Sequence, residues 1–493
     1  MIYKLYKPLR NYLRQFWIGN AFYVIWAYIN YFQFSKSFPK DIEINIEALN
    51  RQRRSVYEWE LSLLAREVIV NSSIDSKMVK KSFNKWSCFA GSINKIKEFE
   101  NNIWPLIGGV SVLRNEFRRI SHRQFPWQQH VTSADFVRYY KIYNSPRIEN
   151  IIKRMLDIDI REWYTIGLSI FGAFLTCPKM KIDLNIEISP ITKKEFDIFL
   201  NFVSADLDQI KETIKRDVKY NDEYVYSFNP LEYYPIVRVD EYYYCPVVNF
   251  LLWRITSGLF FDLVKDSDFG AHFGLAFQDY LLEISNKVLN SNTMVIPEAK
   301  YKIGKKQKDA VDIILNQDNC MFFVEAKAKR MQVKAKTKLC SKSEINKDLD
   351  ILAEDIVQVY QTLNDYKNGH YENIKHDECK KIYPLIVTLE DWFLIGEDLL
   401  YLYNRVLVKL GKKGLPIEIL KESPYVLCSV RIYEILIQVL NKHSIENILL
   451  DWFKPEKKGH DFGNFLLTNY GEGCEQIDHF FPEDFDEIYI KKN

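Results

Sequence analysis

The chain has 493 residues, more than one compact core usually holds, so two or three domains are expected. Hydrophobic residues make up 47% of it and charged residues 27%, which excludes a disordered or fibrous protein. The 67 lysines and arginines nearly balance the 65 aspartates and glutamates, so the overall charge indicates no binding partner and only local clusters are informative.

Residues 1–228 carry apolar side chains at helical spacing and predict a mostly α-helical N-terminal region. Residues 16–35 contain no charge, but Asn20, Asn30 and Gln33 interrupt them, which favours a buried aromatic helix over a membrane span. A membrane-tethered protein is the alternative. Arg118 and Arg119 belong to a basic group that we expect at the surface. The region has no catalytic motif, so we expect it to bind a protein partner or to recognise substrate.

The eight cysteines are scattered without a C-x-x-C pair, which is typical of reduced thiols and not of a disulfide framework or a structural zinc site. We therefore expect a cytoplasmic protein. A homo-oligomer is one possible state, and the sequence does not determine the oligomeric state.

Residues 229–268 predict a connector, in which a β-hairpin at 233–246 precedes a helix at 248–264. From 269 to 455 helices and strands alternate, and residues 456–493 are expected to form a C-terminal tail. The helices of this part are predicted at 271–290, 344–366, 399–410 and 433–440. Its strands are predicted at 293–301, 309–315, 320–328, 382–389 and 425–430, and residues 329–343 as a loop. The order αβββαβ predicts an α/β domain with a mixed central sheet flanked by helices.

Three polar residues stand on two adjacent apolar strands of this domain. Glu325 and Lys327 are two residues apart and therefore project from one face of their strand. If Leu315 pairs with Cys320, Asp312 lies on the same face and diagonal to Glu325. A slip of one residue would turn Asp312 to the opposite face.

Two carboxylates that converge beside a lysine raise each other's pKa unless a divalent cation neutralises them. Mg²⁺, with Mn²⁺ as an alternative, prefers such carboxylates together with water and phosphate oxygens. The residues predict a metal site at which Lys327 would orient or activate the attacking water and neutralise developing charge.

Asp312 followed by Glu325-Ala326-Lys327 resembles the PD-(D/E)xK, or restriction-endonuclease-like, nuclease superfamily over roughly residues 270–450. The resemblance implies that Asp312 and Glu325 are the acidic pair, that Lys327 is the catalytic lysine and that the Ala326 carbonyl completes the metal shell. It implies a metal-dependent endonuclease that hydrolyses phosphodiester bonds of DNA, with RNA as an alternative substrate, in bacterial restriction or anti-phage defence. The alternative is a catalytically degenerate nucleic-acid-binding or scaffolding module on the same fold.

The sequence departs from this family at one position. Gly274, Phe277 and Tyr280 match a helical motif of the family, but Gln278 stands where a glutamate would be. Glu283 or Glu298 would have to substitute for that acid, and the sequence does not distinguish them.

The family also implies a supporting glutamine on the helix after the lysine. Gln358 and Gln361 are both candidates, and Gln361 is preferred.

Basic residues flank the candidate site on both sides and predict a track for nucleic-acid phosphates. Those before it are Lys305, Lys306 and Lys308, and those after it are Lys329 and Arg330.

Overall fold

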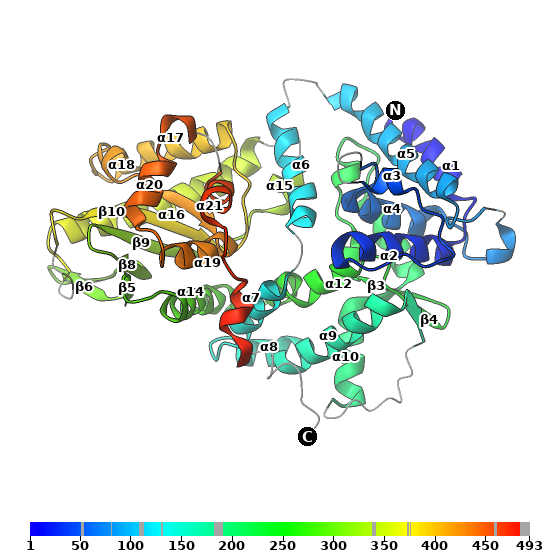
Figure 1. Cartoon of the computed structure of the whole chain (residues 1–493), viewed down its shortest axis with the longest axis horizontal. Helices are drawn as coiled ribbons and strands as arrows, with labels where there is room; N and C mark the ends of the chain where they lie inside the picture. Colours follow the sequence, from blue (N-terminus) through cyan, green and yellow to red (C-terminus); the bar gives the residue numbers. More distant parts are fainter. Residues whose placement is uncertain are drawn as a thin grey trace.

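The computed structural model describes residues 1–50, 54–79, 81–107, 113–129, 132–181, 191–337, 342–371, 374, 376–457 and 461–483. Figure 1 shows two halves, with α6 and α15 between them. The N-terminal half is mostly helical, as predicted. Its longer helices are α1 (Ile2–Leu13), α2 (Ile18–Phe34), α4 (Glu58–Asn71), α5 (Trp86–Ile103), α6 (Leu113–Gln128), α7 (Ser133–Tyr143), α8 (Glu149–Leu156), α9 (Ile160–Thr176), α10 (Lys193–Val203) and α11 (Leu207–Asp217).

The uncharged segment at 16–35 forms α2, which is buried within the helices of this half. Its polar residues are tied to neighbours: Asn20 accepts a hydrogen bond from the Phe83 amide at 2.7 Å, and Gln33 donates to Glu58 at 2.8 Å. Across the described part of the chain, no helix has both the length and the apolar character needed to span a bilayer.

The predicted hairpin is present as β3 (Ile236–Val239) and β4 (Tyr242–Tyr244). It belongs to a small sheet of order β1-β4-β3-β2, in which β1 (Lys179–Met180) and β2 (Ser204–Asp206) are edge strands. The predicted helix at 248–264 is divided into α12 (Val248–Ile255), a 3-10 turn and α13 (Phe260–Leu263).

The C-terminal half is built on a mixed five-stranded sheet of order β11-β10-β9-β8-β5. β9 (Cys320–Lys327), β10 (Lys381–Thr388) and β11 (Val426–Ser429) are parallel, whereas β8 (Ile313–Asn316) and β5 (Met294–Pro297) pair antiparallel. The elements from α14 (Phe269–Val288) through β5, β8, β9 and α16 (Lys342–Lys367) to β10 follow the predicted order αβββαβ. A mixed α/β architecture is therefore confirmed.

Helices cover both faces of the sheet because β9 is apolar on both sides. Phe322 and Val324 face the larger core with α14, α19 (Val430–Val439) and α20 (Ile445–Trp452). Met321 and Phe323 face a second core formed with α16 and α17 (Glu397–Lys412). The larger core continues into the N-terminal half, so the predicted boundary near residue 268 does not separate two independent cores.

Two predicted strands are each divided. Beyond β5 the chain leaves the sheet and forms a separate ribbon of β6 (Lys300–Ile303) and β7 (Lys306–Asp309) before β8 begins. Pro297 has no N–H for a ladder bond, and Gly304, with φ of 61°, takes the left-handed conformation that the tight turn requires. Figure 1 shows the ribbon at the end of the molecule that lies away from the N-terminal half.

Two further segments differ from expectation. Part of the predicted loop 329–343 is the short helix α15 (Val333–Thr337), which packs against α6. The predicted tail contains α21 (Phe462–Tyr470), whose buried phenylalanines pack against α19 and β11. The described part of this tail therefore belongs to the folded body.

Candidate functional site

The hairpin of β8 and β9 brings the predicted acidic pair together. Leu315 pairs with Phe322, so the expected pairing of Leu315 with Cys320 is wrong by two residues. The strands continue further toward the turn than expected, and the chain reverses between Gln317 and Cys320, where an N–H···O bond of 2.9 Å closes the turn.

A register difference of two residues keeps every side chain on its predicted face. Ile313 pairs with Val324, so Asp312, the residue before β8, lies across from Glu325 and no longer diagonal to it. The Asp312 carboxylate accepts a hydrogen bond of 2.6 Å from the backbone N–H of Ala326. Asp312, just before β8, is thus held beside Glu325 of the neighbouring strand β9.

Lys327 completes the cluster at the carboxyl end of β9. Its Nζ lies 2.9 Å from Glu325 Oε1 and 3.6 Å from Asp355 Oδ1 of α16. Sequence reasoning missed Asp355, because a charged residue on a long amphipathic helix has no distinctive pattern. The available signal was its helical position, one turn before Val359, which is buried in the core that β9 forms with α16 and α17.

Burial dominates the electrostatics of this cluster. The pKa of Asp312 is raised to about 8, first by burial and then by the neighbouring Glu325 charge, and the Ala326 N–H opposes the shift. Burial also raises the pKa of Glu325 and of Asp355, against the attraction of Lys327. Burial alone would lower the pKa of Lys327, but Glu325 and Asp355 raise it above the ordinary lysine value, so the amine remains charged.

Of the two candidate acids, Glu298 is the one that contacts Gln278, which occupies the predicted third position. Its charge contributes to raising the pKa of Asp312 and Glu325, and its Oε2 accepts a hydrogen bond of 3.2 Å from Gln278. Glu283 instead pairs with Lys141 of α7 at 2.8 Å. Of the two alternatives, the structure therefore brings Glu298, with Gln278 beside it, toward the pair.

The two glutamines of α16 differ in their position relative to Asp355. Gln361 follows Glu354 by about two helical turns and therefore lies on the same side of α16. The Glu354 carboxylate pairs with Lys409 of α17. Gln358 is exposed. Gln358, three residues after Asp355, lies next to it on the helix surface, whereas Gln361, six residues after it, is turned away from that side. The supporting role of both glutamines stays a prediction.

The basic residues before the site lie on the β6–β7 ribbon. Lys305 and Lys306 are exposed at its turn, whereas Lys308 reaches Asp365 of α16 at 2.7 Å. The neighbouring Tyr301 hydroxyl donates to the same carboxylate at 2.8 Å. The ribbon is therefore anchored at its base and presents its lysines at its tip.

The basic residues after the site differ from expectation. Lys329 lies 3.9 Å from Asp348 and is about one-third exposed. Arg330 is turned inward: its guanidinium pairs with Glu390 at 3.1 Å, donates to the Ser257 carbonyl at 2.8 Å and lies over the Phe260 ring. The expectation that Arg330 contacts phosphate is corrected, because the fold already engages this side chain.

The basic group on α6 is also buried and not at the surface. Arg118 is fully buried, donates to the Ala335 carbonyl of α15 at 2.9 Å and lies 3.7 Å from Asp398 of α17. Arg119 pairs with Glu116 at 3.0 Å. α6 therefore fixes the segment that follows Lys327 against the N-terminal half.

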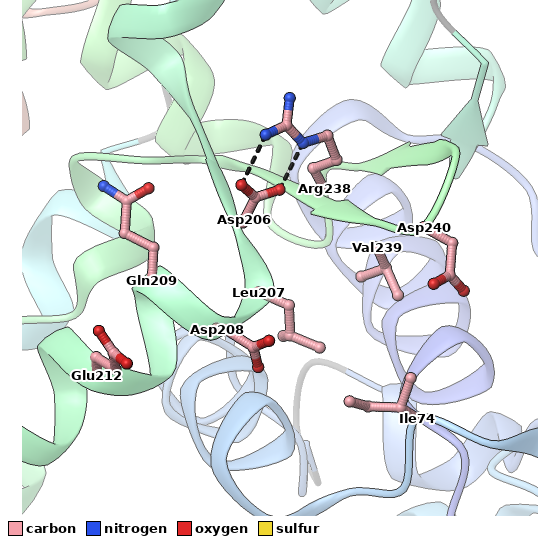
Figure 2. Close-up of a pocket in the computed structure, with 9 residues that line it drawn as sticks. All are labelled: Ile74, Asp206, Leu207, Asp208, Gln209, Glu212, Arg238, Val239 and Asp240. Carbon is pink, nitrogen blue, oxygen red and sulfur yellow. Dashed lines mark hydrogen bonds and ion pairs between the residues drawn. The ribbon is translucent and has the colours of Figure 1, made fainter.

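A cavity of about 410 Å³ in the N-terminal half has a different character (Figure 2). Its polar lining is mainly acidic, from Asp206, Asp208, Glu212 and Asp240. The guanidinium of Arg238 is held by Asp206 through hydrogen bonds of 2.5 and 2.7 Å (Figure 2). This cavity is thus unsuited to phosphate.

The donors of the candidate site are two carboxylates and one backbone carbonyl. Because the Ala326 N–H points to Asp312, the carbonyl of the same strand residue points to that side as well. Within the described ranges no group of three or more His, Cys, Asp or Glu side chains is arranged to hold a metal.

Comparison with known proteins gives no match to any protein-family model, curated protein or solved structure.

Proposed function

We propose that this chain is a metal-dependent endonuclease that hydrolyses phosphodiester bonds of DNA. The observation that carries the proposal is the meeting of Asp312, Glu325 and Lys327 at the ends of adjacent strands. The cluster stands at the carboxyl end of the parallel strands β9 and β10, where ligands of open α/β sheets commonly bind.

The donor set suits a hard divalent cation such as Mg²⁺, with Mn²⁺ as the alternative. Asp312, Glu325 and the Ala326 carbonyl would hold it, and the raised pKa values of both acids are what a nearby cation would reverse. When bound, the ion would polarise the scissile phosphate and favour ionisation of water.

Lys327 acts as a cation in this proposal and not as a proton acceptor. Glu325 and Asp355 raise its pKa, so its ammonium group is poised to donate hydrogen bonds to water and to a phosphate oxygen. Asp355 positions the amine from α16. Lys305 and Lys306 on the ribbon would contact the nucleic-acid backbone.

The second candidate function is a nucleic-acid-binding module without catalysis. Gln278 favours it, because an amide contributes no charge at the position where the nuclease superfamily that this sequence resembles has an acid. The two candidates differ in whether the chain cuts. Metal-dependent cleavage supports the nuclease, and salt-sensitive binding without cleavage supports the module.

The first prediction concerns Asp312. Asp312→Asn should lower plasmid and oligonucleotide cleavage in Mg²⁺ or Mn²⁺ by at least about 100-fold, because it removes a charge that would hold the ion. Asp309→Asn is the matched control, since this exposed aspartate on the ribbon lies beside Lys300. Equal activity of the wild type and Asp312→Asn would refute the proposed site.

A second prediction concerns pH. Asp312 has an ordinary pKa in the unfolded chain but one of about 8 in the metal-free fold, so between these values the folded state binds more protons. Folding stability in EDTA should therefore fall as the pH rises from about 4 to 8 and then level off. Asp312→Asn should flatten this part of the dependence of the melting temperature on pH, and Asp309→Asn should retain it. An unchanged slope in Asp312→Asn would contradict the assignment.

A further inference from the structure

A second cavity, of about 770 Å³, lies between the C-terminal end of α2, the start of α4 and the C-terminal end of α6. None of the lining residues that the structure describes belongs to the Asp312–Glu325 cluster. Its volume falls within the range of about 300–1,000 Å³ that is usual for small-ligand sites. Among the described lining residues are the aromatic side chains of Tyr31, Phe32, Tyr57, Trp59 and Trp127.

Tyr57 and Trp59 form a flat aromatic unit at the start of α4. Their ring centroids are 4.6 Å apart and their planes differ by 9°. Neither ring is fully buried, and Tyr31, which also lines the cavity, is 37% exposed. A recognition site typically has large aromatic side chains that are only partly buried and that lie around a cavity.

Arg54 adds a second flat group to the wall. Its guanidinium carbon lies 3.7 Å from the centre of the Phe32 ring. Glu58 holds the guanidinium at 2.7 Å, and Gln33 in turn fixes Glu58 at 2.8 Å. The guanidinium is therefore held in place before any ligand enters.

The paired charges limit what the cavity can bind. The charges of Arg54 and Glu58 largely cancel, so the cavity does not suit a cluster of phosphates. Flat aromatic and guanidinium groups instead suit a planar heterocycle, because splayed nucleobases stack on both kinds of surface.

We propose that this cavity binds a nucleobase, stacked against Trp59 and beside the Arg54 guanidinium. The base can belong to a free nucleotide or to a single-stranded nucleic acid, which share this chemistry. The site is separate from the cleavage site and does not depend on catalysis by the chain.

Binding is measured in EDTA, where no metal-dependent cleavage occurs, with dAMP by calorimetry and with a labelled single-stranded 12-mer by anisotropy. Trp59→Ala should weaken binding by about tenfold or more, because base stacking on an aromatic residue is lost. Tyr31→Ala is the second variant, since its side chain is already partly exposed. Trp104→Ala is the matched control, because Trp104 is similarly exposed and lies outside the cavity.

The two sources of the base give different results. Saturable binding of dAMP that weakens in both cavity variants identifies a free nucleotide, and binding of the 12-mer alone with the same sensitivity identifies a strand. Affinities equal to wild type in both cavity variants, or absence of binding to either probe, would overturn the proposal. Trp59-dependent capture of a proline-rich peptide in place of both probes would also overturn it.

Discussion

Lys327→Ala is expected to reduce metal-dependent cleavage by about 100- to 1,000-fold, the usual loss when one charged donor to a transition state is removed. The ammonium group lies within 2.9 Å of Glu325 Oε1 and 3.6 Å of Asp355 Oδ1. Its removal takes away the cation that would face the phosphate and leaves two largely buried acids without their shared partner. The rate should be measured under single-turnover conditions, with saturating Mg²⁺.

Lys381→Ala provides a matched control for this substitution. Lys381 stands at the opposite end of the same pair of parallel strands, opposite Cys320, and pairs with Glu446 at 2.9 Å. The Lys381→Ala variant should cleave at the wild-type rate. Melting temperatures show whether a slower variant has lost its fold or only its catalytic group. A folded Lys327→Ala protein that still cleaves at the wild-type rate would contradict the role assigned to Lys327. Mn²⁺ binding should persist in Lys327→Ala, since the proposed ligands Asp312 and Glu325 remain.

The faces of the acidic pair could be predicted from the sequence because they depend on alternation along strands. Glu325 and Lys327 must share a face whatever the register, and Asp312 joins them in every register of the right parity. The register itself depends on the turn, and the polar residues Asn316 and Gln317 looked like turn residues although Asn316 continues the strand. That error moved Asp312 by two positions without changing its face.

The burial of the arginines could not be predicted in the same way. Arg118 and Arg330 occur in basic stretches, which sequence reasoning assigns to solvent. Their partners, Asp398 and Glu390, come from distant parts of the chain. Asp398 of α17 meets Arg118 through the packing of α6, whereas Glu390 meets Arg330 because the two residues follow the paired strands β10 and β9. Asp355 was missed for a related reason, since only the docked helix brings it to Lys327.

The largest effect on stability is expected from Arg138→Ala. Arg138 of α7 donates to both oxygens of Glu434 of α19, at 2.6 Å each, and both side chains are 5% exposed. The Tyr280 hydroxyl donates to the same carboxylate at 2.7 Å. Removing the arginine leaves a buried carboxylate without its cation, which typically destabilises a protein by ~3–5 kcal/mol. The urea midpoint should therefore fall markedly.

Arg238→Ala is the matched control, because Arg238 makes the same two-pronged contact with Asp206 while both side chains are about half exposed. Solvent screens such a pair, and its loss should change stability by less than ~1 kcal/mol. The double variant Arg138→Met/Glu434→Leu should recover part of the loss, since replacing both charges removes the unpaired carboxylate. Because Arg138 joins α7 to α19, hydrogen exchange in Arg138→Ala should rise in both helices. Equal urea midpoints for Arg138→Ala and Arg238→Ala would show that this buried pair does not hold the N-terminal half to the sheet domain.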